Sequence, residues 1–325
     1  MQVFLDGRVP EGLRQWYGGG RLVGMGKDGK PLDEDARPLV VGEVWRRLAA
    51  KVALYSENIK SEDSDIAEYL QPNQVAVGTK AGAEVAIHTL RQWCTRHIHD
   101  TDMAALQRDY KNAFNEADEH EFLTSCYERL PNCAKLAEWC YGEPVNLIYH
   151  GRVLQSQKGQ QGCPLMMPMY CAMRQKIREL TPTAQRLSLK VDYADDGMDG
   201  GSLKNIWETL QEESEIAERF GAEFNFSKMT LYLLAGEYFN TDRDNEDPKF
   251  KENVEMLKKF KDAGITLDYS QNIKFMKVPI IGSVEFVQAF IDEKMQEFET
   301  TLDALTSLPN PPCCILLVAA SRKCM

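Results

Sequence analysis

The sequence contains no long hydrophobic run. None of its segments approaches the roughly 20 uninterrupted apolar residues of a membrane-spanning helix, and residues 1–6 have neither a basic start nor an apolar stretch. We therefore expect an intracellular protein, nuclear or cytoplasmic, without a signal peptide or a transmembrane segment. The 325 residues, 43% of them hydrophobic, are enough for one large core or two smaller ones.

Cysteine pairs suited to metal binding are also lacking. The nine cysteines are scattered and odd in number, with no CxxC pair and no histidine at zinc-site spacing, which favours reduced thiols. Three of them, Cys126, Cys133 and Cys140, are seven residues apart. We expect these three to be packing residues that share a helix face.

The chain has too little positive charge to bind nucleic acid through its bulk electrostatics. It carries 38 basic and 49 acidic residues, and its net charge is −11. This balance does not exclude an enzyme that acts on nucleic acid, because a local basic groove and metal ions suffice for binding.

What the sequence does have is a pair of adjacent acids at the end of an alternating segment. Residues 187–193 read LSLKVDY, with an apolar residue at every second position, which predicts a strand with one buried face. Asp195 and Asp196 follow at its tip, before a glycine that favours a tight turn. Asp109 follows another short apolar segment, residues 103–106. Carboxylates at the ends of adjacent strands are the hard ligands that a two-metal phosphoryl-transfer site needs.

Periodicity and turn residues outline the remaining elements. Strands are expected at residues 21–27, 36–41, 145–149, 153–155, 225–234 and 273–281, and helices at residues 42–59, 82–98, 164–180 and 203–220. The first of these helices is predicted to bury a stripe of Val44, Leu48, Val52, Tyr55 and Ile59. Beyond the N-terminal part, the order of strands and helices is typical of a split βαβ (ferredoxin-like) unit on an antiparallel sheet, and so of an α+β fold.

Three short segments resemble the core motifs of reverse transcriptases. They are DYKNAFN at residues 109–115, QQGCPL at 160–165 and YADD at 193–196. Three further segments are similar to flanking motifs of that family: GAEFNFSK at 221–228, RPLVVG at 37–42 and VPIIG at 278–282. Their order and spacing resemble the non-LTR retrotransposon and group II intron type. Several motifs in the right order are a more specific signal than any one alone.

The resemblance implies an RNA-directed DNA polymerase (reverse transcriptase) with a right-hand architecture of fingers and palm. Residues 1–100 would form a fingers-like region. Residues 101–290 would form the palm, with a helical and hairpin insertion at 116–158. Residues 291–325 would be the start of a thumb or a tail, too short for a complete thumb, as in a truncated retroelement protein. The implied partners are an RNA template, a DNA primer and dNTPs, with two Mg²⁺ ions as cofactor and Mn²⁺ as a substitute.

The resemblance also assigns catalytic and metal-binding roles. Asp109 and Asp195 would bridge the two Mg²⁺ ions, one activating the primer 3′-OH and the other the leaving pyrophosphate, and Asp196 would assist them. Phe114, five residues after Asp109, would be a steric gate whose ring excludes a ribose 2′-OH. The alternative for Phe114 is ordinary packing in the core.

Contacts to the incoming nucleotide follow in the same way. Gln161 would supply hydrogen bonds and Gly162 would let the backbone approach closely. Lys27 and Arg37 would neutralise the triphosphate, and Lys228 would protonate the pyrophosphate or hold its charge. For these three cations, a solvated or salt-bridged surface position is the alternative.

Three departures from the family pattern leave other functions open. The MMP at residues 166–168 is one residue longer than the usual small residue and proline. The MDGG at residues 198–201 is a poor return strand, and a short thumb would weaken the grip on a duplex. A non-catalytic RNA-binding remnant of a retroelement palm is therefore one alternative function. An RNA-dependent RNA polymerase is the other, although Phe114 and Ala194 favour DNA synthesis.

Overall fold

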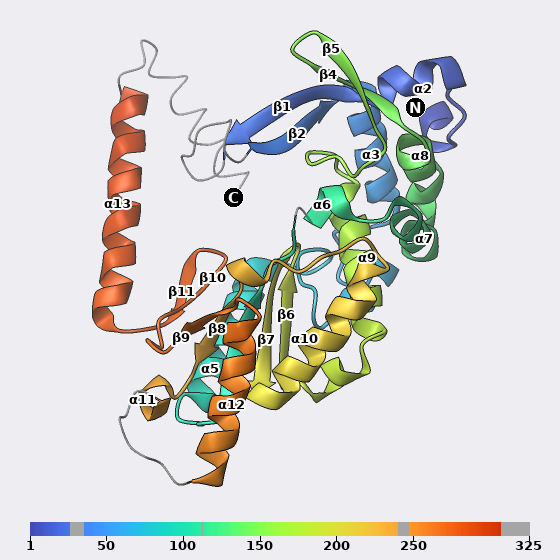
Figure 1. Ribbon diagram of the computed structural model, residues 1–325. Helices are drawn as coiled ribbons and strands as arrows, with labels where there is room; N and C mark the ends of the chain where they lie inside the picture. Colours follow the sequence, from blue (N-terminus) through green and yellow to red (C-terminus); the bar gives the residue numbers. More distant parts are fainter. Residues whose placement is uncertain (27–35, 112, 240–246, 307–325) are drawn as a thin grey trace. The chain divides into compact units, whose positions relative to one another are not determined.

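The computed structural model describes residues 1–26, 36–111, 113–239 and 247–306 (Figure 1). The chain divides into two compact units, Met1–Ser270 and Gln271–Met325. In the described part of the chain, no helix is both long and apolar enough to cross a bilayer.

A five-stranded sheet forms the centre of the first unit. Its strand order is β6-β7-β3-β8-β9, and all neighbours are antiparallel except β8 and β9. The strands are β3 (Met103–Arg108), β6 (Leu189–Tyr193), β7 (Asp196–Ser202), β8 (Thr230–Leu233) and β9 (Thr266–Asp268). The predicted mixed α+β fold with an antiparallel sheet is therefore confirmed.

Helices cover both faces of this sheet (Figure 1). On one face, α9 (Met166–Glu179) and α10 (Leu203–Glu218) send charged side chains towards the strands. On the other face, α5 (Gly82–His97) packs against β6 and places Trp93 over Gly200. Because both faces are buried, the inner strands have little contact with water.

The glycine-rich return strand was expected to be poor, yet it is the inner strand β7, paired with both β6 and β3. The lack of side chains is what lets the neighbours approach. A Cβ on Gly200 would come within 2.7 Å of the Trp93 ring, and one on Gly197 would come within 2.6 Å of the Arg108 guanidinium. Close packing thus outweighs the low strand propensity of glycine at these positions.

A second sheet has four strands, in the order β2-β1-β4-β5. It joins two predicted hairpins, one near the N-terminus and one in the middle of the chain. It comprises β1 (Gly20–Gly26), β2 (Ala36–Gly42), β4 (Val145–Tyr149) and β5 (Arg152–Ser156). Both hairpins were predicted, but their union through a parallel pairing of β1 with β4 was not.

The helix α3 (Val44–Ser56) is present as predicted, but its predicted buried stripe is wrong. Val44 is 70% exposed and Tyr55 is 86% exposed. The buried residues of α3 are Arg46, Ala49, Ala50 and Ala53. Small side chains let a helix axis come close to its neighbour, which here is α8 (Pro131–Tyr141). Size, rather than hydrophobicity alone, selects the buried face.

The remaining helices of the first unit complete its core. Cys126 lies on α7 (Glu119–Arg129), whereas Cys133 and Cys140 lie on α8, so the three predicted packing cysteines are fully buried but occupy two helices. The other helices and 3₁₀ turns are α1 (Gln2–Leu5), α2 (Glu11–Tyr17), α4 (Asp65–Leu70), α6 (Ala113–Glu116), α11 (Gly236–Phe239), α12 (Pro248–Asp262), η1 (Pro182–Arg186) and η2 (Phe226–Lys228).

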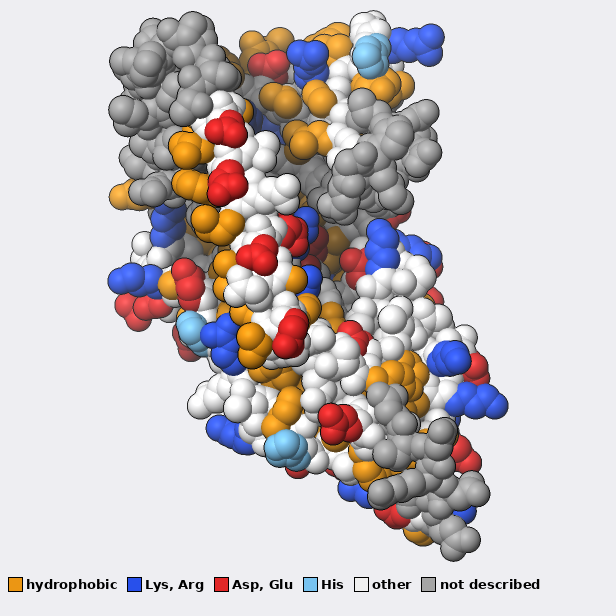
Figure 2. Space-filling model, turned by 90° about the vertical axis from the view of Figure 1, so that its left-hand side faces the viewer, with side chains coloured by type: hydrophobic (Ala, Val, Ile, Leu, Met, Phe, Trp, Pro, Cys, Tyr) orange, Lys and Arg blue, Asp and Glu red, His pale blue; other side chains and the backbone are white. Residues whose placement is uncertain are grey.

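The second unit contains a small hairpin and a long helix. The single strand predicted at residues 273–281 is two strands, β10 (Ile273–Phe275) and β11 (Val278–Ile281), because Met276 and Lys277 adopt positive φ angles of 50° and 64° and turn the chain back. α13 (Val284–Thr306) follows, and Figure 2 shows acidic and hydrophobic side chains side by side along it.

Candidate active site

The two adjacent acids lie at the turn between β6 and β7. Tyr193 pairs with Asp196, so Ala194 and Asp195 form a two-residue turn, with a positive φ of 55° at Ala194 only, as in a type II′ hairpin. Gln74, which is 2% exposed, holds this turn from outside the sheet. Its Oε1 accepts from the Ala194 amide at 2.9 Å, and its Nε2 donates to the Ala194 carbonyl at 3.1 Å.

Asp109 lies beside this turn, directly after the last residue of β3. Arg108 is paired with Gly197, so Asp109 and Asp196 stand one residue beyond the last pair of the β3–β7 ladder. The Cα atoms of facing antiparallel residues are about 5 Å apart. The carbonyl of Asp109 accepts from the Asn225 amide at 2.9 Å, which fixes the end of β3 on its other side. The fold therefore brings the three predicted acids to one edge of the sheet.

The three carboxylates do not form a complete metal-binding cage. Asp195 and Asp196 are exposed and Asp109 is half-buried. No three His, Cys, Asp or Glu side chains of the described residues are grouped so as to hold a metal ion by themselves. Mg²⁺ in nucleotide sites is usually held by one or two carboxylates together with phosphate oxygens and water, not by a complete protein cage.

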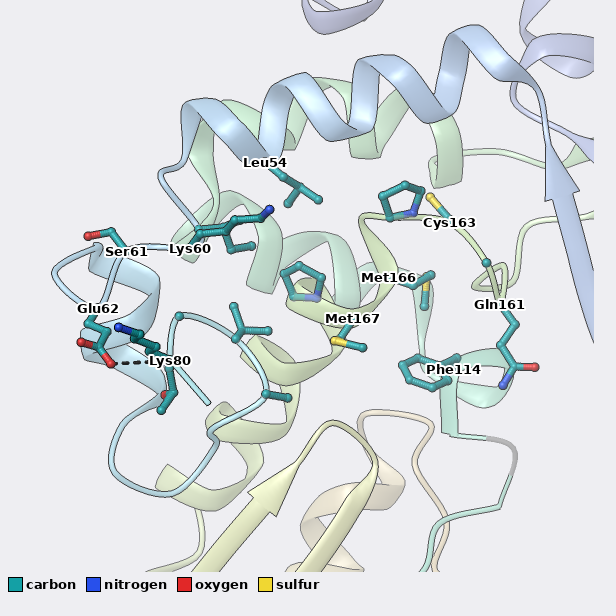
Figure 3. Close-up of a pocket in the computed structure, with 18 of the residues that line it drawn as sticks. Leu54, Lys60, Ser61, Glu62, Lys80, Phe114, Gln161, Cys163, Met166 and Met167 are labelled. Carbon is teal, nitrogen blue, oxygen red and sulfur yellow. Dashed lines mark hydrogen bonds between the residues drawn. The ribbon is translucent and has the colours of Figure 1, made fainter. Parts of the chain in front are cut away.

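A cavity of about 910 Å³ opens beside the start of α9, and none of the three acids lines it (Figure 3). Its wall includes Phe114, Gln161 and Gly162, and most of the remainder is apolar, with Met166 and Met167 prominent. Three predicted nucleotide-binding residues thus share one cavity. Met167 is 42% exposed and lines this cavity.

Tyr170 connects the cavity wall with the acidic turn. The centre of its ring lies 4.7 Å from that of Phe114. Burial raises the pKa of the Tyr170 hydroxyl to about 12, and the nearby Asp195 carboxylate adds to this rise against the opposing effect of Arg174. Phe114 is half-buried and touches both the cavity and the core, so neither role considered for it excludes the other.

The Gln161–Gly162 segment is held by backbone bonds from the N-terminal sheet. The Val40 amide donates to the Gln161 carbonyl at 3.0 Å. Gly162 has φ of 101°, and a Cβ there would come within 3.0 Å of the Val40 carbonyl oxygen, so a glycine is needed at this position. The fully buried Arg46 donates to the side chain of Gln160 and to the Gly18 carbonyl, which secures the residue before this segment.

The predicted cations are less closely placed. Lys228 is exposed, and its amide donates to the Asn225 carbonyl at 2.9 Å in the turn that also holds Asp109. Arg37 lies in β2 opposite Met25, but its side chain is not among those described. Lys27 lies outside the described residues. A triphosphate-binding role for these three side chains stays a prediction.

Several residues at this site were not predicted from the sequence. Gln74 lies 120 positions before the turn that it holds, in a segment without a motif. Arg108, Tyr110 and Asp192 sit next to the acids in sequence but are buried, with their polar groups in contact with Glu213 or with one another. Gln74 follows Asn73 in the stretch QPNQ at residues 71–74, and a polar residue in a polar stretch gives no signal for a clamp.

No protein-family model matches the chain, and no curated protein matches it significantly in sequence. Solved telomerase structures are similar to it. Telomerase from Candida albicans in complex with a TWJ fragment of telomeric RNA has a TM-score of 0.47 and 13% identity, covering 74% of this chain and 44% of that one. Apo telomerase from Candida tropicalis has a TM-score of 0.46, 14% identity and coverages of 69% and 45%. Apo telomerase from Candida tropicalis truncated from the C-terminal domain has a TM-score of 0.44 and 12% identity, covering 66% of this chain and 50% of that one. The chain thus spans half or less of each of these structures.

Proposed function

We propose that the protein is an RNA-directed DNA polymerase, which joins dNTPs to a primer 3′-OH on an RNA template and releases pyrophosphate. The observation that carries this proposal is the meeting of Asp109, Asp195 and Asp196 at one edge of the sheet. Tyr170 connects their turn to the cavity that Phe114 lines. Paired carboxylates suit metal-assisted phosphoryl transfer, and a largely apolar cavity with a few polar side chains suits a nucleotide.

Asp109 and Asp195 would hold two Mg²⁺ ions, with Asp196 assisting; Mn²⁺ is a substitute. When bound, the ions supply activation of the 3′-OH and stabilisation of the charge on the pyrophosphate. The protein's own contribution is to hold the acids in place. The Gln74 clamp and the β3–β7 pairing fix the backbone around them before substrate binds, which limits reorganisation during the reaction.

The cavity residues select and orient the nucleotide. Phe114, which lines the cavity, would press its ring against the sugar and exclude a 2′-OH. Gln161 would supply hydrogen bonds beside the close backbone approach at Gly162. Lys27 and Arg37 would neutralise the triphosphate, and Lys228 would donate a proton to the pyrophosphate or hold its charge.

The proposal extends to domain roles and origin. The sheet of β1, β2, β4 and β5 would belong to the fingers and the five-stranded sheet to the palm, while residues 291–325 would begin a thumb or form a tail. A retroelement protein of the non-LTR or group II intron type would have this organisation. An RNA template and a DNA primer are then the partners.

The decisive experiment is primer extension on an RNA template, with dNTPs or NTPs, in Mg²⁺ or Mn²⁺. We expect dNTP incorporation that falls at least about a hundredfold in Asp195→Asn, because a metal ligand contributes several kcal/mol to transition-state stabilisation. Asp262→Asn, an exposed acid at the end of α12, is the matched control and should keep full activity.

Other outcomes would replace the proposal. Incorporation of NTPs alone would identify an RNA-dependent RNA polymerase. RNA binding in a gel shift without incorporation of any nucleotide would identify a non-catalytic RNA-binding protein. Equal incorporation by the wild type and Asp195→Asn would refute the site.

A further inference from the structure

Directly beside the three acids lies a cluster of buried charges. Six ionisable side chains meet on the sheet face that α9 and α10 cover, each with a side-chain exposure of 4% or less. β3, β6 and β7 contribute one each, α9 contributes two and α10 one. The members of this six-charge cluster are Arg108, Arg174, Arg178, Asp192, Asp199 and Glu213.

Arg108 is the centre of the cluster. Its Nε lies 3.0 Å from an oxygen of Asp199, its Nη1 lies 3.0 Å from Glu213, and its Nη2 donates to Asp192. Arg178 contacts the same three carboxylates from α9, with its Nη1 2.6 Å from Glu213. Arg174 adds weaker contacts, 3.6 Å to Asp192 and 3.8 Å to Glu213.

The cluster is directly connected to the acids of the candidate site. Arg108 precedes Asp109, and Tyr110 follows it; the Tyr110 hydroxyl donates to Glu213 at 2.7 Å. Successive side chains of a strand alternate between faces, so Asp109 is flanked by two residues whose polar groups are anchored in the interior. Asp192, Gly197 and Arg108 form one row across β6, β7 and β3, next to the turn with Asp195 and Asp196.

The cluster is balanced in charge, with three arginines and three carboxylates. Burial would raise the pKa of Asp192 and of Glu213, but the arginines outweigh it and hold both pKa values below their usual range. Buried ion pairs of this kind add little stability over well-packed apolar residues, because desolvation offsets the attraction. A balanced cluster that contributes little net stability can still fix geometry, since its bonds need defined directions.

We propose that the Arg108–Asp192 link is a positioning device: it ties the end of β3 to the end of β6 and so holds Asp109 in register with the Asp195–Asp196 turn. This inference deepens the proposed polymerase function and rests on it. Arg178 and Asp199 link α9 to the middle of β7, two rows farther from the acids than the Arg108–Gly197 pair, and do not join the strand ends beside the acids.

Two matched double variants separate the two links. Arg108→Met with Asp192→Asn removes the positioning link. Arg178→Met with Asp199→Asn removes the second link and the contact between Arg108 Nε and Asp199, but leaves the Arg108–Asp192 link in place. Each leaves two arginines against two buried carboxylates, so the change in charge and in composition is the same. Circular dichroism and urea unfolding establish that both proteins are folded before the next measurements.

Amide hydrogen exchange measures how often the backbone around the acids opens, and it needs no assumption about activity. In the first variant we expect exchange in residues 108–111 and 193–196 to rise at least about tenfold, because local opening becomes easier. Mn²⁺ affinity, measured by electron paramagnetic resonance, should fall about ten- to a hundredfold, as for losses of residues that orient metal ligands. The second variant should match the wild type in both measurements within about threefold.

Each outcome decides one statement. Equal exchange of these segments in the two variants would overturn the positioning role. Mn²⁺ binding that is the same in the wild type and Asp195→Asn would overturn the proposed metal site, while the exchange data still decide the positioning role. If the first double variant does not fold, Asp192→Asn alone replaces it: exchange should rise in residues 108–111 and 193–196, because the charged partner of Arg108 is lost, and unchanged exchange in both would overturn the inference.

Discussion

At the scale of single residues, Phe114 illustrates how one side chain meets two requirements. Its ring packs on Tyr170 and lines the cavity, so the core holds the ring and the cavity exposes one side of it. A rigidly held aromatic ring can discriminate between sugars by sterics alone, because it does not move aside for an additional hydroxyl group.

We expect Phe114→Ala to admit ribonucleotides. The ratio of incorporation of a dNTP to that of the matching NTP should fall by about ten- to a hundredfold, since removal of the ring relieves a steric penalty of a few kcal/mol at most. Single-nucleotide incorporation kinetics measure this ratio. Phe226→Ala, another half-buried phenylalanine that packs on the core but does not line the cavity, should leave it unchanged. An unchanged ratio in both variants would remove the gate role.

The acids of the site could be predicted from the sequence, whereas the residues that hold them could not. Asp109, Asp195 and Asp196 sit in short motifs whose order is informative in itself. Asp192 lies between the apolar positions of its strand, yet it is 3% exposed because α9 supplies Arg174 and Arg178 to that face. A contact partner that lies far away in the sequence leaves no local signal.

At the scale of elements, the β6–β7 turn depends on a residue that belongs to neither strand. Gln74 satisfies both backbone groups of Ala194, which would otherwise be buried without a partner. We expect Gln74→Ala to lower the free energy of unfolding by about 1–3 kcal/mol, the usual effect of leaving buried polar groups unpaired.

Urea unfolding measures the effect of Gln74→Ala, and Gln185→Ala is the matched control. Gln185 is exposed and its Oε1 accepts only a long bond from Lys190, at 3.4 Å, so its loss should change stability by less than about 0.5 kcal/mol. Similar losses of unfolding free energy in the two variants would show that the hydrogen bonds from Gln74 to Ala194 do not stabilise the protein.

The buried cluster also predicts how stability depends on pH. The arginines hold the pKa of Glu213 below its usual value of 4.5, so its stabilising effect is present above that value and is lost as the pH falls through the lower, folded-state pKa. Glu213→Gln should destabilise the protein by about 3–5 kcal/mol at neutral pH, because it leaves a buried arginine uncompensated.

Protonation makes the wild-type residue resemble glutamine. The difference in unfolding free energy between the wild type and Glu213→Gln should therefore shrink as the pH falls below 4.5 towards 3. Urea unfolding at several pH values tests this, and a difference that stays constant would show that Glu213 is not ionised in the folded protein. Asp199 has the opposite tendency, because burial raises its pKa, so the comparison concerns Glu213 alone.

Element positions followed from periodicity more reliably than the faces that elements bury. The hairpins at β1–β2 and β4–β5 and the helix α10 appear as predicted because local turns and apolar repeats define them. The buried face of α3 was wrong because alanines permit a closer approach than larger residues do, and β7 was undervalued because its glycines are required by its neighbours. Both errors come from packing partners that the sequence does not reveal.

At the scale of the whole molecule, the first unit contains the four-stranded and five-stranded sheets and the large hydrophobic core. The second unit carries α13, in which six acidic residues accompany a single lysine: Glu285, Asp292, Glu293, Lys294, Glu297, Glu299 and Asp303. A thumb binds the primer–template duplex through contacts with phosphates, and those contacts need basic side chains. α13 has the opposite charge.

Residues 1–270 alone should therefore fold and bind RNA as the full chain does. Both sheets stay complete, so we expect a cooperative thermal transition within about 4 °C of that of the full chain, the shift that about 1 kcal/mol produces in a chain of this size. Affinity for a primer–template duplex, measured by fluorescence anisotropy at fixed salt, should change by less than about threefold. α13 has a single lysine, so removing it takes away almost no positive charge that could contact phosphates. A loss of tenfold or more in the folded shorter chain would mean that the second unit grips the duplex after all, through residues other than the acidic helix surface.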